Sequence, residues 1–294
     1  MTDKPDLRIA IIGAATGSCI VLTPAGITGL ATAIALRKLS NVDVQIYERA
    51  TELRELGQAI ALNPNGLRTL EKLGLDNILS DELGYRCPSG IPQTLRCTLA
   101  NKRSSGTREA HCSCRWDDTT DTAILREMFA EYHPVVKDIV AVAPHIRTYP
   151  NFYGGFLDTY HFAGRVVLVG DAAHSHGGAL AANASLGMDD AYCLYLSFLE
   201  QMSPAGTLEL DSEKLKQVLS LYEAVRRPHC ERVLKVAHAL YDGNNQRLWG
   251  GGETETDEQL REKLRTRPYA EWIHEYDVEA AFKKTRDDVQ VGKL

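Results

Sequence analysis

The sequence predicts an α/β protein built on a parallel sheet, and three observations support this prediction. Residues 7–12 and 42–48 are aliphatic-rich stretches of strand length, and a helical stretch of small residues lies between them. A third aliphatic stretch, Val166–Val169, runs directly into Gly170 and Asp171. Ligands of open α/β sheets bind beyond the carboxyl ends of the strands, so the glycines and acids that follow these strands are candidate binding residues.

The first two stretches and the segment between them predict a βαβ unit. Leu7–Ile12 is expected to form a buried strand that ends at Gly13, and Ala25–Leu36 a helix with small residues facing the sheet. Val42–Glu48 is expected to form the second strand. Glu48 stands about 20 residues after the last glycine of the unit, where a carboxylate hydrogen-bonds a ribose hydroxyl. The pattern is therefore typical of nucleotide binding.

An insertion interrupts the glycine pattern of this unit. The usual spacing is G-x-G-x-x-G in one tight turn, but residues 14–25 separate Gly13 from Gly26 and Gly29. Removing residues 15–25 would restore the spacing, whereas a register through Gly17 lacks a glycine at the helix start. The insertion is either a surface loop that lets Gly26 meet Gly13 or retained non-coding sequence.

The third aliphatic stretch begins a second binding pattern. Val166–Val169 is expected to be a strand buried on both faces, which Gly170 ends. The small-residue run Gly177–Gly187 follows, and residues 188–194 are expected to be helical. Small residues let a flat ligand approach the backbone, and a helix N-terminus offers free N–H groups to oxygen atoms. An ordinary buried strand with a tight turn is the alternative interpretation.

Further helices are expected along the chain. Asn65–Leu73 is amphipathic, which simple packing explains, and Gly74 is a suitable stop. Leu215–Arg227 and Pro228–Tyr241 predict two helices, because proline is tolerated at a helix start. Trp272–Phe282 is expected to pack back on the domain.

Composition limits the class of protein. The 294 residues are 44% hydrophobic, which is typical of a globular protein, and the net charge of −6 argues against a nucleic-acid partner. Seven cysteines, an odd number, indicate reduced thiols and a cytoplasmic location. His111, Cys112 and Cys114 lack a second pair at zinc-finger spacing, so no metal site is expected.

One segment leaves membrane association open as a minor alternative. Ile9–Leu36 carries no charged residue and is long enough to cross a bilayer. Its glycines and threonines and a proline dilute the hydrophobicity, and no cleavage site follows. We therefore expect no membrane anchor.

The second binding pattern carries a family resemblance. Gly170–His174 and the following run to Gly187 resemble the second FAD-binding motif of class A flavin-dependent aromatic monooxygenases, especially fungal salicylate hydroxylase-like and phenol-hydroxylating enzymes. Arg147–Tyr153, Leu125–Pro134 and Arg226–Pro228 also resemble segments of that family. The resemblance implies a Rossmann-like FAD-binding domain. It also implies a reduced, incomplete substrate domain, because residues 81–115 are far fewer than the family's middle region.

The resemblance also implies roles for individual residues. The glycines near the N-terminus would face the FAD pyrophosphate, Glu48 the adenosine ribose and Asp171 the ribityl or pyrophosphate region. Backbone N–H groups of residues 183–185 would lie near the flavin carbonyls, although the family has glycine where Asn183 and Ala184 stand. The FAD-binding residues implied are Gly13, Gly26, Gly29, Glu48, Gly57, Ala61, Asp171, Asn183 and Ala184.

The implied function is hydroxylation of a phenolic or polyketide-derived aromatic, using FAD, NAD(P)H as co-substrate and O2, in secondary metabolism. No catalytic residue is assigned. The alternative is a catalytically impaired flavin-binding remnant, an interaction protein or a truncated gene product. His174 and His176 are interpreted as a turn histidine and an exposed neighbour rather than as a metal pair or general base.

The resemblance also divides the chain into four regions. Residues 1–85 and 151–241 would form the FAD-binding domain, and residues 86–150 a residual substrate-domain segment. Residues 242–294 would form a C-terminal helical tail. The oligomeric state is left open.

Overall fold

The computed structural model describes most of the chain outside three long gaps. The chain divides into two compact units, one formed by residues 1–77 and 152–294 and the other by residues 78–151. Gly13, Gly57, Ala61 and the inserted residues 15–25 lie outside the described residues, and so do His111, Cys112 and Cys114. The described residues are 7–12, 26–48, 62–75, 118–143, 146–148, 153–177, 180–249, 256, 258–259, 261–262 and 271–292.

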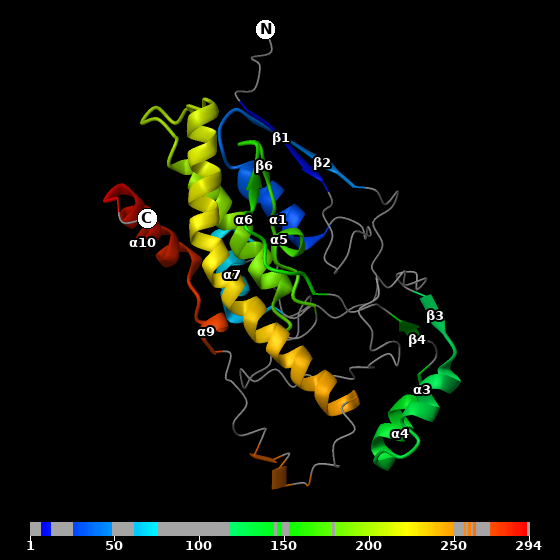
Figure 1. Ribbon diagram of the computed structural model, residues 1–294. Coiled ribbons are helices and arrows are strands. Elements are labelled where there is room, and N and C mark those ends of the chain that lie inside the picture. The colour runs from blue at the N-terminus through cyan, green and yellow to red at the C-terminus, as the bar shows by residue number, and fades with distance from the viewer. Residues whose placement is uncertain are drawn as a thin grey trace. The chain divides into compact units, whose positions relative to one another are not determined.

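The first unit begins with the predicted βαβ arrangement (Figure 1). Strands β1 (Leu7–Ile12) and β2 (Val42–Tyr47) pair in parallel, and helix α1 (Ile27–Leu36) connects them. The expectation that β1 is buried was wrong, because Ile11 is its only buried residue and Ile12 is 81% exposed. Among the described residues β1 has β2 as its only strand partner.

The second binding pattern also differs in detail from the prediction. Val166–Val167 forms β6, a short antiparallel partner of β5 (His161–Phe162), and Val166 is 52% exposed. The predicted strand buried on both faces was therefore wrong. Its residues turn back on β5 through the positive-φ pair Ala163 and Gly164. The one-turn helix α5 (Asp171–His174) follows.

Helix α6 (Asn183–Leu199) is longer than the predicted helix over 188–194. It begins inside the small-residue run because those residues pack closely on α1 and on α2 (Pro64–Lys72). Helix α2 ends as predicted, since Gly74 adopts φ +76° and donates its N–H to the carbonyl of Glu71 at 2.8 Å.

Helix α7 (Ser212–Trp249) is one continuous helix, so the prediction of two helices that meet at Pro228 was wrong. An interior proline costs a helix about 3 kcal/mol. Packing on both sides of Pro228 offsets this cost, because each half of α7 inserts buried side chains into the core. These are Val218, Leu219, Tyr222 and Val225 before the proline and Cys230, Val233, Leu234 and Ala237 after it.

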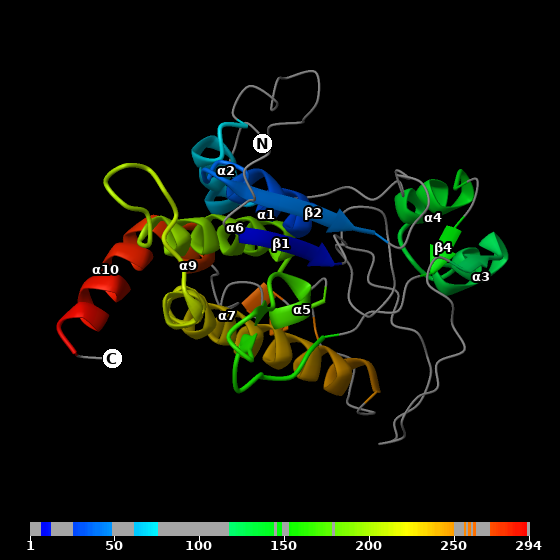
Figure 2. The same ribbon diagram turned by 90° about the horizontal axis from the view of Figure 1, so that it is seen from above.

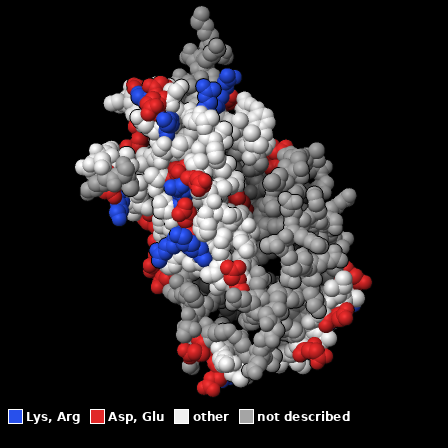
Figure 3. Space-filling view, in the orientation of Figure 1, with Lys and Arg blue, Asp and Glu red and all other residues white. Residues whose placement is uncertain are grey.

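Helix α6 is the centre of this unit. It contacts α1 and α2 on one side and α7 on the other, as Figure 2 shows. The core cluster between these helices includes Leu36, Leu194, Phe198 and Tyr222. On the face seen in Figure 3, acidic and basic residues are interspersed along α7, where Arg227 pairs with Glu223 and Glu231 at i,i+4 spacing.

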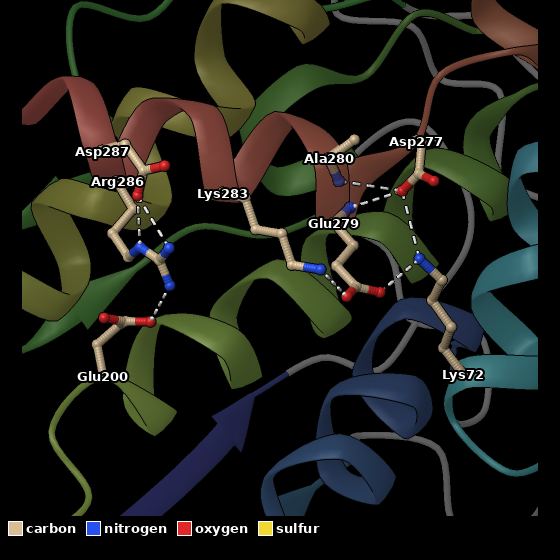
Figure 4. A network of polar contacts seen from close by, with 8 residues as sticks. All are labelled: Lys72, Glu200, Asp277, Glu279, Ala280, Lys283, Arg286 and Asp287. Carbon is tan, nitrogen blue, oxygen red and sulfur yellow. Dashed lines mark hydrogen bonds and ion pairs between the residues drawn. The ribbon is translucent and has the colours of Figure 1, made fainter.

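The C-terminal segment packs back on the same unit, as the sequence predicts. It forms α9 (Glu271–His274) and α10 (Val278–Gln290), and Val278 and Phe282 are buried in the core cluster. Ion pairs attach α10 to α2 and α6 (Figure 4). Lys72 Nζ lies 2.8 Å from Glu279 and 3.3 Å from Asp277, and Arg286 lies 3.2 Å from Glu200.

The second unit contains strands β3 (Asp118–Thr120) and β4 (Ile146–Thr148), which pair in antiparallel fashion, and two helices. Leu125–Pro134, which the sequence places in one helix, is divided between α3 (Thr122–Met128) and α4 (Pro134–Ala141). Pro134 starts α4 because it cannot continue a helix but fits the first position of the next one.

No helix in the described part of the chain is both long and apolar enough to cross a bilayer. The described residues of Ile9–Leu36 belong to the end of β1 and to α1.

We expect Gly187→Ala to destabilise the protein by about 1–3 kcal/mol, because the added methyl group would overlap Thr28 in a tightly packed core. This would reverse the usual gain of about 1 kcal/mol when alanine replaces a helical glycine. Urea unfolding would measure the loss, and Thr28→Ala in the same chain should restore part of it. The control is Gly155→Ala, whose methyl group would meet no atom within 4 Å. Equal effects of the two glycine substitutions would contradict the packing argument.

We expect Lys72→Met to lower stability by about 0.5 kcal/mol at pH 7 and to have a smaller effect as the pH falls below the ordinary carboxyl pKa. Hydrogen bonds from Lys283 and Lys72 lower the pKa of Glu279. Burial opposes ionisation of Asp277, but bonds from Ala280 and Lys72 still lower its pKa. Lowered carboxyl pKa values stabilise the fold above the ordinary pKa, and the contribution is lost as the pH falls through the folded-state values. Denaturant titrations across this range test the expectation, which fails if the loss is the same at pH 7 and pH 3.

Candidate functional site

The candidate site lies where the two sequence patterns meet. At the carboxyl ends of β1 and β2, Ile12 and Tyr47 are 81% and 53% exposed. Gly26, the buried N-cap of α1, has no side chain that could accept hydrogen bonds from the first N–H groups of the helix. An open strand end beside an uncapped helix start is the arrangement in which α/β sheets bind phosphates.

Thr28, in the first turn of α1, brings the two patterns into contact. A Cβ atom at Gly170 would lie 2.7 Å from Thr28 Oγ1, and one at Gly187 would overlap the same side chain. Gly170 also adopts φ +59°, which favours glycine. The turn before Asp171 and the first turns of α6 therefore pack directly on the start of α1, although about 140 residues separate them.

The remaining predicted residues occupy this region or its border. Asp171 is the first residue of α5 and is half-buried, and Asn183 Nδ2 donates to Asp171 Oδ1 at 3.0 Å. Ala184 is buried in the first turn of α6. Gly29 is buried in α1, and Glu48 directly follows β2. The expected crowding by Asn183 stays a prediction, although its amide is engaged with Asp171.

The start of α2 adjoins the start of α6. The Asn63 N–H donates to Ser185 Oγ at 2.9 Å, and neither helix has a side-chain cap bond. Asn63 is 6% exposed, and its Nδ2 has no hydrogen-bond partner among the described residues. A buried amide donor without an acceptor is rare, and the carbonyl oxygen of a ligand would satisfy it. Sequence reasoning missed Asn63, although an Asn-Pro pair at a helix start was a usable signal.

A buried ionic network contacts the backbone of Gly170. Asp190, on α6, accepts hydrogen bonds from the Gly170 N–H at 2.7 Å, from His174 Nε2 at 2.6 Å and from Arg226 Nε at 2.7 Å. Asp190 and Arg226 are fully buried, and His174 is 2% exposed. Arg226, on α7, also donates to the Leu186 carbonyl at 3.2 Å.

The pKa values of the two adjacent acids of α6 shift in opposite directions. Burial opposes ionisation of Asp190, but the charges of His174 and Arg226 outweigh it and lower the pKa to about 2. Burial raises the pKa of Asp189, which accepts hydrogen bonds from Thr69 and Asn65. Burial also opposes protonation of His174, yet the negative potential of Cys230 and Asp190 raises its pKa well above the ordinary value. His174 and Asp190 therefore form a charged pair.

This network corrects the interpretation of the two histidines. His174 is a buried ion-pair partner rather than an ordinary turn residue, and His176 is buried instead of exposed. One ligand atom each from His174, Asp190 and Cys230 would fit within 4.8 Å of one another. A cation there would meet the Arg226 guanidinium, which already binds Asp190 and lies 3.6 Å from Cys230 Sγ. The donor set therefore favours an ion pair over a metal site.

Sequence reasoning did not identify Asp190 or Arg226 as site residues. The signal was present, because Met188–Ala191 places two acids side by side in an otherwise apolar stretch of α6. Charged residues are almost never fully buried unless they are paired, so two such acids in a buried helix require partners elsewhere.

Comparisons with known proteins agree with the family resemblance that the sequence indicates. No family model matches the chain. Salicylate hydroxylase of Pseudomonas putida is 39% identical over 72 residues, which are 24% of this chain and 14% of that protein. Hispidin-3-hydroxylase of Neonothopanus nambi is 39% identical over 74 residues, or 22% and 17% of the two chains. The FAD-dependent monooxygenase SAT7 of Stachybotrys chartarum is 28% identical over 180 residues, or 58% and 35%. The matches thus cover between 14% and 35% of the length of these relatives.

Solved structures show the same fold. A salicylate hydroxylase substrate complex aligns with a TM-score of 0.60 at 16% identity, covering 96% of this chain and 98% of that one. Klebsiella pneumoniae HpxO complexed with FAD and uric acid aligns with a TM-score of 0.54 at 16% identity, covering 98% and 97% of the two chains. The chain is therefore similar in sequence to salicylate hydroxylase-like FAD-dependent monooxygenases and has their α/β fold, which confirms the resemblance indicated by the sequence.

Proposed function

We propose that this chain binds FAD and is an FAD-dependent monooxygenase that hydroxylates an aromatic substrate with NAD(P)H and O2. The observation that carries the proposal is the contact of Thr28 with Gly170 and Gly187, which joins both predicted FAD-binding patterns into one site. The relatives support the aromatic substrate class, because they include salicylate hydroxylase, hispidin-3-hydroxylase and 3-amino-4-hydroxybenzoate 2-monooxygenase.

The residues present fit FAD. Two uncapped helix starts, those of α1 and α6, offer N–H groups to pyrophosphate and carbonyl oxygens. The unpartnered amide of Asn63 lies beside the α6 start and would donate to a flavin carbonyl. The carboxylate of Glu48 would bind the adenosine ribose, and Asp171 the ribityl or pyrophosphate region. Gly26 and Gly29 would let the pyrophosphate approach the α1 backbone.

FAD, when bound, supplies the redox chemistry of hydroxylation. This chain would bind and orient FAD and exclude water from the flavin. The helix dipole at the α6 N-terminus favours negative charge on the nearest flavin atoms. Residues 1–85 and 151–241 would form the FAD-binding domain, residues 86–150 would contribute to the substrate domain, and residues 242–294 would form the tail. A phenolic or polyketide-derived substrate, a role in secondary metabolism and a cytoplasmic location belong to this proposal.

A second candidate function is a flavin-binding remnant or interaction protein without turnover. The short coverage of the curated relatives, 14–35% of their length, favours it. It shares the FAD site with the first function, so turnover is the property that distinguishes the two.

We expect the purified chain to bind FAD, with an absorbance band near about 450 nm that belongs to the bound flavin. The interrupted glycine pattern predicts weak or substoichiometric occupancy. Asp171→Asn, which keeps the shape and removes the charge, should raise the Kd for FAD about tenfold. Asp138→Asn, at an exposed position of α4, is the control and should leave the Kd unchanged.

NADPH oxidation stimulated by salicylate or another phenol, with a hydroxylated product detected by mass spectrometry, would support the monooxygenase over the remnant. FAD binding without stimulated oxidation would favour the remnant. Protein that remains colourless with excess FAD would overturn both functions.

A further inference from the structure

One oxygen atom of Asp190 holds both ends of the turn that carries Asp171. Oδ2 accepts the N–H of Gly170, the N-cap of α5, and the ring Nε2 of His174, the last residue of α5. Asp171 lies between these two anchors. Any displacement of the Asp190 carboxylate would therefore move the whole one-turn helix and, with it, the Asp171 side chain.

The other oxygen connects this turn to the start of α6 through α7. Asp190 Oδ1 accepts from Arg226 Nε, and Arg226 also donates to the carbonyl of Leu186, in the first turns of α6. The same guanidinium thus fixes Asp190 and the backbone just after Asn183 and Ala184. Asn183 in turn donates to Asp171, so a direct hydrogen bond also joins the start of α6 to α5.

We propose that Asp190 is a positioning residue of the FAD site, which sets Asp171 and the α6 N-terminus in their binding geometry through Gly170, His174 and Arg226. The inference rests on the proposed FAD-binding function. Asp190 is fully buried and both its oxygens accept hydrogen bonds, so it acts through these groups rather than by contact with a ligand. Residues that orient ligand-binding groups in this way typically change affinity about 10–100-fold when they are replaced.

Stability alone is a weaker explanation of the network. A buried ion pair is often no more stabilising than apolar residues of the same volume, because desolvation cancels the attraction between the charges. Here the three donors come from the turn before Asp171, from α5 itself and from α7. The adjacent Asp189 provides the contrast, since it is equally buried but, among the side chains that the structure describes, binds only Asn65 and Thr69 of α2.

The test compares Asp190→Asn with two matched controls in the 294-residue chain. Asp189→Asn replaces the neighbouring buried carboxyl by an amide, and Leu234→Ala destabilises the core at a buried position of α7. For each protein, circular dichroism gives the folded fraction and the Tm without FAD. Fluorescence titration then gives the Kd for FAD under conditions where the protein is folded. The visible circular dichroism of the bound flavin reports its orientation.

We expect Asp190→Asn to raise the Kd for FAD about tenfold or more and to change the visible circular dichroism. Both controls should keep the wild-type spectrum and a Kd within about twofold of wild type, even where their loss in Tm is equal or larger. Should Asp190→Asn not fold, His174→Gln, which removes the positive charge from one of the three donors, takes its place with an expected change in the same direction.

Two outcomes would overturn the inference alone: a wild-type Kd and spectrum in the folded Asp190→Asn protein (or in His174→Gln when it takes that place), or an equal loss of affinity in Leu234→Ala. Absence of FAD binding by the wild-type chain would instead overturn the proposed function on which the inference rests. The two failures are therefore distinguishable in one set of titrations.

Discussion

The buried carboxylate of Asp190 is the constraint on which the arrangement of the first unit depends. An ionised carboxylate removed from water costs several kcal/mol unless it is paired and fully hydrogen-bonded. Its donors come from three different segments, because Gly170 precedes α5, His174 ends it and Arg226 stands in the middle of α7. Since none of these donors is local to Asp190 on α6, the charge is satisfied only when all the segments are in their final places.

Close packing imposes a second constraint on the same segments. Thr28 occupies the space that side chains at Gly170 and Gly187 would fill, and Ser185 occupies the space beside Gly66. At these contacts helices α1 and α2 approach α6 so closely that only glycine fits. The ionic network holds α6 against α7 and the α5 turn, while the glycine contacts hold it against α1 and α2. Together they fix the α6 N-terminus, where the proposed flavin-binding N–H groups begin.

Local patterns in the sequence predicted those features that depend on interactions between residues close together in the chain. The parallel pairing of β1 with β2, the small-residue helix α1 and the stop at Gly74 follow from periodicity and glycine conformation. The continuity of α7 through Pro228 could not be predicted this way, because tertiary packing of both halves outweighs the local cost of proline. The exposure of β1 and β6 could not be predicted either, because it depends on which elements pack against each strand.

The candidate site shows the same division. Glycine spacing predicted Gly26 and the family resemblance implied Asp171 and Asn183, and the structure places all three at or near helix starts. The partners of buried charges were not predictable, because Asp190 and Arg226 are 36 residues apart and belong to different helices. The burial of His176 was missed for the same reason, since an isolated histidine in a turn carries no signal of what packs over it.

The insertion at residues 15–25 raises the question of how the α1 N-terminus keeps its place beside Gly170. In an uninterrupted G-x-G-x-x-G turn, chain continuity would place it. Here the contacts of residues 26–48 are sufficient to hold the start of α1 in place. Thr28 packs on Gly170 and Gly187, Ala35 and Leu36 are buried, and β2 pairs with all of β1. The position of the helix start is thus set by tertiary packing against α6, so the described part of the first predicted FAD-binding pattern meets the second one whatever length of chain precedes Gly26.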